Sequence, residues 1–211
     1  SNSTGGNNVA IGREALALNT TASNNTAVGY VSLYSNTTGT NNVALGGNTL
    51  QPNTTGSQNT ALGKGASASN STGSNNTSVG FEALVSNTTA VENTAVGYQA
   101  GYTNTTGTGL TAVGYQAAYS NTTGSSYTTA VGWKALYNNT SGIFNTAVGQ
   151  SALESNVTGG SNTSVGLATL ALTTGSSNTA IGQGAGYYIT SGSKNTIIGR
   201  YNGNQGGLNI A

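Results

Sequence analysis

Only four residues of this sequence carry a carboxylate side chain, and any acid-base chemistry would have to start from them. They are Glu14, Glu82, Glu92 and Glu154, and the chain contains no Asp, His or Cys. Glu14 and Glu82 occupy one position of a repeating unit, four units apart, which corresponds to about 19 Å between stacked strands. A glycosidase needs a carboxylate pair about 5 to 9.5 Å apart. The sequence therefore predicts no catalytic residue, no metal site and no cofactor, and we expect no enzyme.

One short stretch, GQGAG at 182–186, resembles part of the glycine-rich fingerprint of dinucleotide-binding proteins. That fingerprint requires a helix directly after the glycines. The sequence predicts no helix there, and Gly182 belongs to the repeat described below. We therefore interpret this stretch as part of the repeat.

The sequence does contain candidate sites for N-linked glycosylation, because Asn-x-Ser/Thr recurs at a fixed interval. Such sequons are acceptors for N-linked glycans, and they are also built from the residues that tight turns use. Both interpretations stay open: a ladder of glycans along the molecule, or a repeated turn. The asparagines are Asn19, Asn36, Asn53, Asn70, Asn87, Asn104, Asn121, Asn139 and Asn156.

Pairs of threonines follow several of these asparagines and suggest a third kind of function. They are Thr20-Thr21, Thr37-Thr38, Thr54-Thr55 and Thr105-Thr106. Regular threonine arrays on a flat repeat protein can bind ice. Adjacent residues of a strand point to opposite faces, so only one threonine of each pair could join such an array.

The composition excludes several classes of protein. The 211 residues carry a net charge of +1, and only 4% of them are charged, against about 25% in ordinary domains. Nucleic-acid binding needs clustered basic residues, whereas the five here are scattered. No apolar run is long enough to cross a membrane. The 11 tyrosines and the regular apolar pattern favour an ordered protein over a disordered one.

The elements that must position all these residues follow from a repeat of 17 residues. A glycine closes each unit, with steps of 17 residues apart from one of 18 and one of 16. Repeats this short stack on their neighbours to bury a common core. The glycines are Gly12, Gly29, Gly46, Gly63, Gly80, Gly97, Gly114, Gly132, Gly149, Gly166, Gly182 and Gly199.

Within a unit the apolar residues predict strands. Runs such as 9–11 and 43–45 are short and near period 2, and a second strand would carry the leucine four residues after the glycine. Turn residues separate the two. The prediction is an all-β, parallel β-solenoid of about twelve coils, forming one domain over 1–211. Its core would consist of the aliphatic residue before each glycine and the leucine after it.

Two further columns recur with the repeat. An asparagine precedes the glycine by four residues, where stacked amides can hydrogen-bond from coil to coil; these are Asn8, Asn25, Asn42, Asn59, Asn76, Asn93, Asn145, Asn162, Asn178 and Asn195. Aromatic residues often follow the glycine directly, and we expect them to pack between chains, with sugar stacking as the alternative; these are Tyr30, Phe81, Tyr98, Tyr115 and Trp133.

The segments NNVAIG (7–12) and NTAVGYQA (93–100) resemble the head repeats of trimeric autotransporter adhesins and, more closely, the repeats of phage tail-fibre and related surface proteins. The resemblance covers all twelve units. It implies a left-handed parallel β-roll, commonly a homotrimer, that projects from a surface and binds another. By position it implies that Val9 and Ile11, Thr26 and Val28, and Val43 and Leu45 point inward. Ala10, Ala27 and Ala44 would then face outward or toward a neighbouring chain.

Together these observations predict a non-enzymatic structural and adhesive fibre segment on a cell or virion surface, outside the cell. Its partners would be copies of itself and a surface glycan or receptor, with no nucleic acid and no membrane insertion. The alternative is a subunit of an extracellular filament that polymerises end to end and, on the glycan interpretation of the sequons, is coated with glycans. That alternative rests on the ends, SNSTG at 1–5 and LNIA at 208–211, which carry no polar cap.

Overall fold

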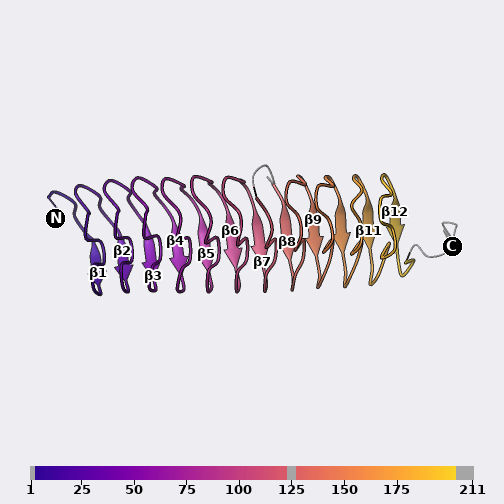
Figure 1. Ribbon diagram of the computed structural model, residues 1–211, viewed down its shortest axis with the longest axis horizontal. Coiled ribbons are helices and arrows are strands. Elements are labelled where there is room, and N and C mark those ends of the chain that lie inside the picture. Colours follow the sequence, from indigo (N-terminus) through magenta and orange to yellow (C-terminus); the bar gives the residue numbers. More distant parts are fainter. Residues whose placement is uncertain (1–2, 123–126, 203–211) are drawn as a thin grey trace.

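Each 17-residue unit forms one coil of a rod. The computed structural model describes residues 3–122 and 127–202 and contains twelve parallel strands in a single sheet, in sequence order (Figure 1). This confirms the all-β, parallel β-solenoid. Eleven steps between strands correspond to a length of about 53 Å. The strands are β1 (Val9–Ile11), β2 (Thr26–Val28), β3 (Val43–Leu45), β4 (Thr60–Leu62), β5 (Thr77–Val79), β6 (Thr94–Val96), β7 (Thr111–Val113), β8 (Thr129–Val131), β9 (Thr146–Val148), β10 (Thr163–Val165), β11 (Thr179–Ile181) and β12 (Thr196–Ile198).

The register pairs equivalent positions of the repeat along the whole sheet. Thr77 lies opposite Thr94, and Val79 lies opposite Val96. The same pairing continues from β7 to β8, where the repeat step is 18, and from β10 to β11, where it is 16. β-branched residues favour such extended segments because their rotamers fit a pleated sheet. Insertions and deletions are therefore absorbed outside the strands.

The prediction of which strand residues point inward is wrong. The central alanines Ala27 and Ala44 are fully buried, whereas Val43 and Leu45 are 40% and 38% exposed. Thr26 and Val28 likewise lie on the outer side and are half-buried. The reason is the narrow interior: in most coils a leucine after the glycine fills the space opposite the sheet and leaves room for a small side chain such as alanine.

The first coil departs from this pattern, because it has a neighbour on one side only. All of β1 is exposed, and Val9 and Ile11 are 46% and 60% exposed. Ala10 is exposed as well. The expected inward orientation of Val9 and Ile11 is therefore wrong for this coil too.

The second predicted strand is absent from the described residues. In seven of the described coils the segment after the glycine contains the predicted leucine, which is buried, but the backbone of this segment alternates into the left-handed region. Val31 and Leu33 both have φ of 49°, an outlier for a β-branched residue. The Val31 amide donates to the Arg13 carbonyl of the preceding coil, and the Leu33 amide donates to the Thr49 carbonyl of the following one. Hydrogen bonds along the rod thus hold a conformation that local preference disfavours.

The glycines that close each unit allow neighbouring coils to pack closely. Gly97 has φ of 138°, and a Cβ atom there would lie 2.3 Å from the carbonyl oxygen of Gly114 in the next coil. No side chain fits at that distance, so each coil approaches the next backbone to backbone at this corner.

Candidate functional site

The asparagine four residues before the glycine forms a mostly buried ladder, as predicted, in two runs, because Leu110 and Thr128 take its place between Asn93 and Asn145. The Asn59 side chain accepts a bond from the backbone amide of Asn76 at 3.1 Å and donates to the Asn42 oxygen at 3.1 Å. Its Nδ2 also donates to the Gly73 carbonyl at 2.9 Å. A buried amide is stable only when its polar groups are paired. These side chains therefore shape the coil and offer no group to a ligand.

The sequon asparagines form a second buried ladder at the corner of the coil. Asn70 Nδ2 donates to the Asn53 oxygen at 2.9 Å and to the Gly73 carbonyl at 3.0 Å. Gly73 thus receives one amide from each ladder. All nine sequon asparagines are fully buried. A glycan on Nδ2 has no room in the folded coil, so the structure supports the turn interpretation and contradicts the glycan ladder.

The corner ladder is interrupted at one place and ends at another. Within the described residues, the buried oxygens Asn87 Oδ1 and Asn156 Oδ1 have no hydrogen-bond partner. Thr173 follows Asn156 in this column, and its hydroxyl donates to the Ile189 carbonyl. A buried acceptor without a donor costs about 1–3 kcal/mol. These two points are the weak links of an otherwise paired interior.

The groups capable of acid-base chemistry do not converge. Glu14 lies 3.4 Å from Arg13 at the surface, and Glu82 accepts a hydrogen bond from Gln99 at 2.9 Å. No group of three or more metal-ligating side chains occurs among residues 3–122 and 127–202. Gly182, Gly184 and Gly186 have positive φ within an ordinary coil, and no helix occurs in the described part of the chain. The structure brings no catalytic set together there.

The aromatic residues after the glycine do come together, and we call Phe81, Tyr98, Tyr115 and Trp133 the aromatic strip. Successive ring centroids lie 5.5, 5.2 and 6.3 Å apart, with interplanar angles of 11° or less. The four side chains are 38–44% exposed. Tyr30 belongs to the same column but lies three coils away from Phe81, where Arg13 covers its ring at 5.7 Å.

A second aromatic column runs parallel to the strip on the same coils. Tyr102, Tyr119 and Tyr137 stack at 4.9 and 5.1 Å. Burial, reinforced by the neighbouring Tyr102, raises the pKa of Tyr119. Lys134 Nζ joins the two columns, because it lies 4.7 Å from the ring centre of Trp133 and 5.0 Å from that of Tyr137. The tyrosines of the second column each lie five residues after the repeat glycine, but the sequence did not reveal this link between the columns.

The stacking decides which surface the rings offer. Each ring of the strip has a neighbouring ring across its face, and the ammonium of Lys134 lies over Trp133. A sugar stacks on a ring face, whereas here mainly the edges are exposed. The geometry thus favours packing against an apolar protein surface over sugar stacking.

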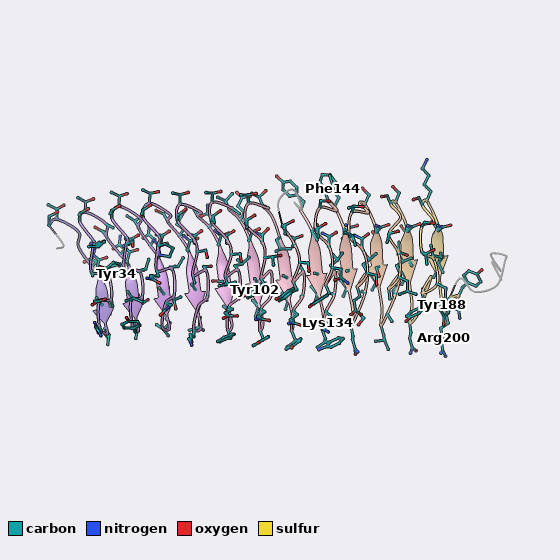
Figure 2. The ribbon with its side chains drawn as sticks, in the orientation of Figure 1. Tyr34, Tyr102, Lys134, Phe144, Tyr188 and Arg200 are labelled. Carbon is teal, nitrogen blue, oxygen red and sulfur yellow. The ribbon has the colours of Figure 1, made fainter. Side chains whose placement is uncertain are left out.

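The sequence reasoning missed a larger array on the outside of the sheet. Because the central residue of each strand points inward, its two neighbours form parallel columns of threonine and aliphatic residues from β2 to β12. The alternation Thr-Ala-Val was the available signal, since only the small residue suits a narrow core. Figure 2 shows that Lys134 and Phe144 lie on opposite sides of the rod, so the outer surfaces differ in chemistry.

Tyr187, Tyr188 and Arg200 lie near the C-terminal end of the described rod (Figure 2 labels the latter two) and line a cavity of about 330 Å³. It also borders Asn202, the last described residue before 203–211, so we assign it no ligand. The expected LNIA segment at 208–211 lies outside the described residues, as do the first two residues of SNSTG.

No helix in the described part of the chain has the length and hydropathy needed to cross a membrane. Comparison of the chain with family models, with curated proteins and with solved structures gave no match.

Proposed function

We propose that the protein is a non-enzymatic structural and adhesive rod, displayed outside a cell or virion, whose coils present the aromatic strip for contact with other chains. The observation that carries the proposal is the strip itself: four stacked, half-exposed rings on coils that backbone hydrogen bonds hold together. Exposed aromatic residues in a row are typical of protein interfaces. Backbone hydrogen bonds hold the strip in place, since the amides of Gln99 and Gln116 in the following coils donate to the carbonyls of Phe81 and Tyr98 at 2.9 Å. A backbone fixed in this way lowers the entropic cost of binding.

A homotrimer is the assembly we propose, because the core is thin. A typical coil buries little more than two alanines and a leucine, as in Ala130, Ala135 and Leu136. Proteins with so little apolar core gain stability from association. Packing the strips of neighbouring chains together would bury their remaining apolar area.

The test is the native mass by light scattering of the wild-type chain and of two variants. We expect the wild type at three times 20.8 kDa. Replacing Tyr98 and Tyr115 together by Ser should give the single-chain mass. Tyr30→Ser is the matched control, because it changes an exposed tyrosine of the same column outside the strip, and it should remain a trimer.

Two results would count against this assembly. A wild-type chain that is a folded monomer excludes contact between copies through the strip, and adhesion to a foreign surface is then measured on intact cells with the same variants. A ladder of masses that persists in the double variant would instead favour end-to-end filaments.

A further inference from the structure

The outer face of the sheet is a regular two-column array, independent of the aromatic strip. One column is formed by the first strand residue, which is Thr in all strands except β1 and β3, and the other by Val, Leu or Ile. Strand geometry spaces the residues about 4.8 Å along the rod and about 6.7 Å across each strand. None of these positions in β1–β12 is charged.

The strands of this face run in nearly the same direction along the rod in the view of Figure 1. Sheets ordinarily twist by about 20° per strand. Successive strands are paired in one register from β1 to β12, so the two columns continue along the whole sheet.

The threonine hydroxyls of this face are available for hydrogen bonds. Within the described residues, the hydroxyls of strand threonines such as Thr94, Thr111 and Thr129 have no protein partner. Each can donate one bond and accept two. Their χ1 angles are stiff because threonine and valine are β-branched. The hydroxyls and methyl groups are therefore fixed in a lattice before anything binds.

The corner threonines provide a contrast. The hydroxyls of Thr37 and Thr54 donate to carbonyls of the next coil, at 3.0 and 3.1 Å. Their neighbours Thr38 and Thr55 are exposed. Only one threonine of each pair is free, so the corner offers a single column and no two-dimensional array.

We propose that the outer face of the sheet binds ice, with the threonine hydroxyls joining the hydrogen-bonded water lattice and the aliphatic column resting between its waters. Ordered water satisfies every hydroxyl of the face. A dry protein partner would leave unpaired any hydroxyl it did not match, and each buried unpaired group costs free energy. Ordering water on groups that are already fixed adds little further entropy loss.

The test measures ice growth in a nanolitre osmometer with the full chain. We expect the wild type to halt growth over an interval below the melting point and to produce faceted crystals. Thr111→Lys places a long charged side chain in the middle of the face and should lose most of that interval. Thr106→Lys, which makes the same change at an exposed corner threonine, should keep it.

Circular dichroism and native mass must show that all three proteins fold alike. If Thr111→Lys does not fold, Thr111→Tyr replaces it, since tyrosine is favoured in strands, and the same loss is expected. Ordinary ice growth by the folded wild type would overturn the proposal, and so would an unchanged interval in the Thr111 variant. A wild-type oligomer that Thr111→Lys dissociates, without ice activity, would show that a second copy covers this face. None of these results depends on the aromatic strip.

Discussion

The interior corner of the coil and the outer surface of the rod obey opposite rules. At the corner most units repeat an Asn whose amide donates to the carbonyl of a Gly three residues on, and in the described residues nearly every buried polar side-chain atom has a hydrogen-bond partner. Directly after the glycine, on the surface, the residue changes freely among Arg13, Tyr30, Gly47, Lys64 and Phe81. We infer that contacts along the rod set the stability of the protein, so the surface residues are free to carry function.

Two neighbouring glycines give the largest expected effect. A Cβ at Gly46 would lie 2.8 Å from the Gly63 carbonyl, and its φ is 134°, whereas a Cβ at Gly47 meets nothing within 4 Å. Gly46→Ala should destabilise the rod by about 3 kcal/mol, because overpacking and a disfavoured backbone add together. Gly47→Ala should be neutral or slightly stabilising.

The measurement is the thermal melt of both variants by circular dichroism. Equal melting temperatures for Gly46→Ala and Gly47→Ala would show that the coils do not pack as tightly at the unit-closing glycines as the structure indicates.

The corner ladder gives the next largest effect. Asn70 makes two donor bonds and accepts one from Asn87, whereas Asn87 Oδ1 has no partner. Asn70→Ala should therefore cost about 1 kcal/mol more than Asn87→Ala, the value of one net hydrogen bond. Urea unfolding of the two variants checks the difference, and the reverse order would contradict the ladder.

N-linked glycosylation of the sequons tests whether the corner asparagines are buried in the folded chain. The chain expressed in a cell that attaches N-linked glycans should give a folded fraction with the unmodified mass of 20.8 kDa. The reason is that Nδ2 of residues such as Asn53 and Asn70 is buried and bonded. Denatured intact mass of the folded fraction measures this, and sugar-sized additions there would exclude the corner geometry.

The smallest expected effect concerns pH. The pKa of Tyr119 is raised in the folded chain above its ordinary value of 10.0. The folded state therefore keeps its proton more tightly than the unfolded state does, so stability is constant below about pH 10 and falls above it. Melts at pH 9 and pH 11 should show a smaller fall in Tyr119→Phe than in the wild type. Identical falls would mean that Tyr119 titrates normally.

The sequence predicted the coil, its period and both asparagine columns, because each depends on spacing alone. It also placed the leucine of the core correctly. It failed on the direction of the strand residues, since a three-residue strand such as Val43–Leu45 reads equally well with either face inward. What decides is the width of the interior, a property of the assembled rod. The second strand failed for a similar reason, because bonds to adjacent coils outweigh the local preferences of residues such as Val31.

The constant register has a consequence for length. Because each coil contacts only its two neighbours, and because the register survives both an 18-residue and a 16-residue step, adding or removing a whole unit changes nothing elsewhere in the rod. Each added unit extends it by about 4.8 Å. Duplication of one repeat in the gene therefore lengthens the protein by a fixed increment. The number of repeats sets how far the rod extends.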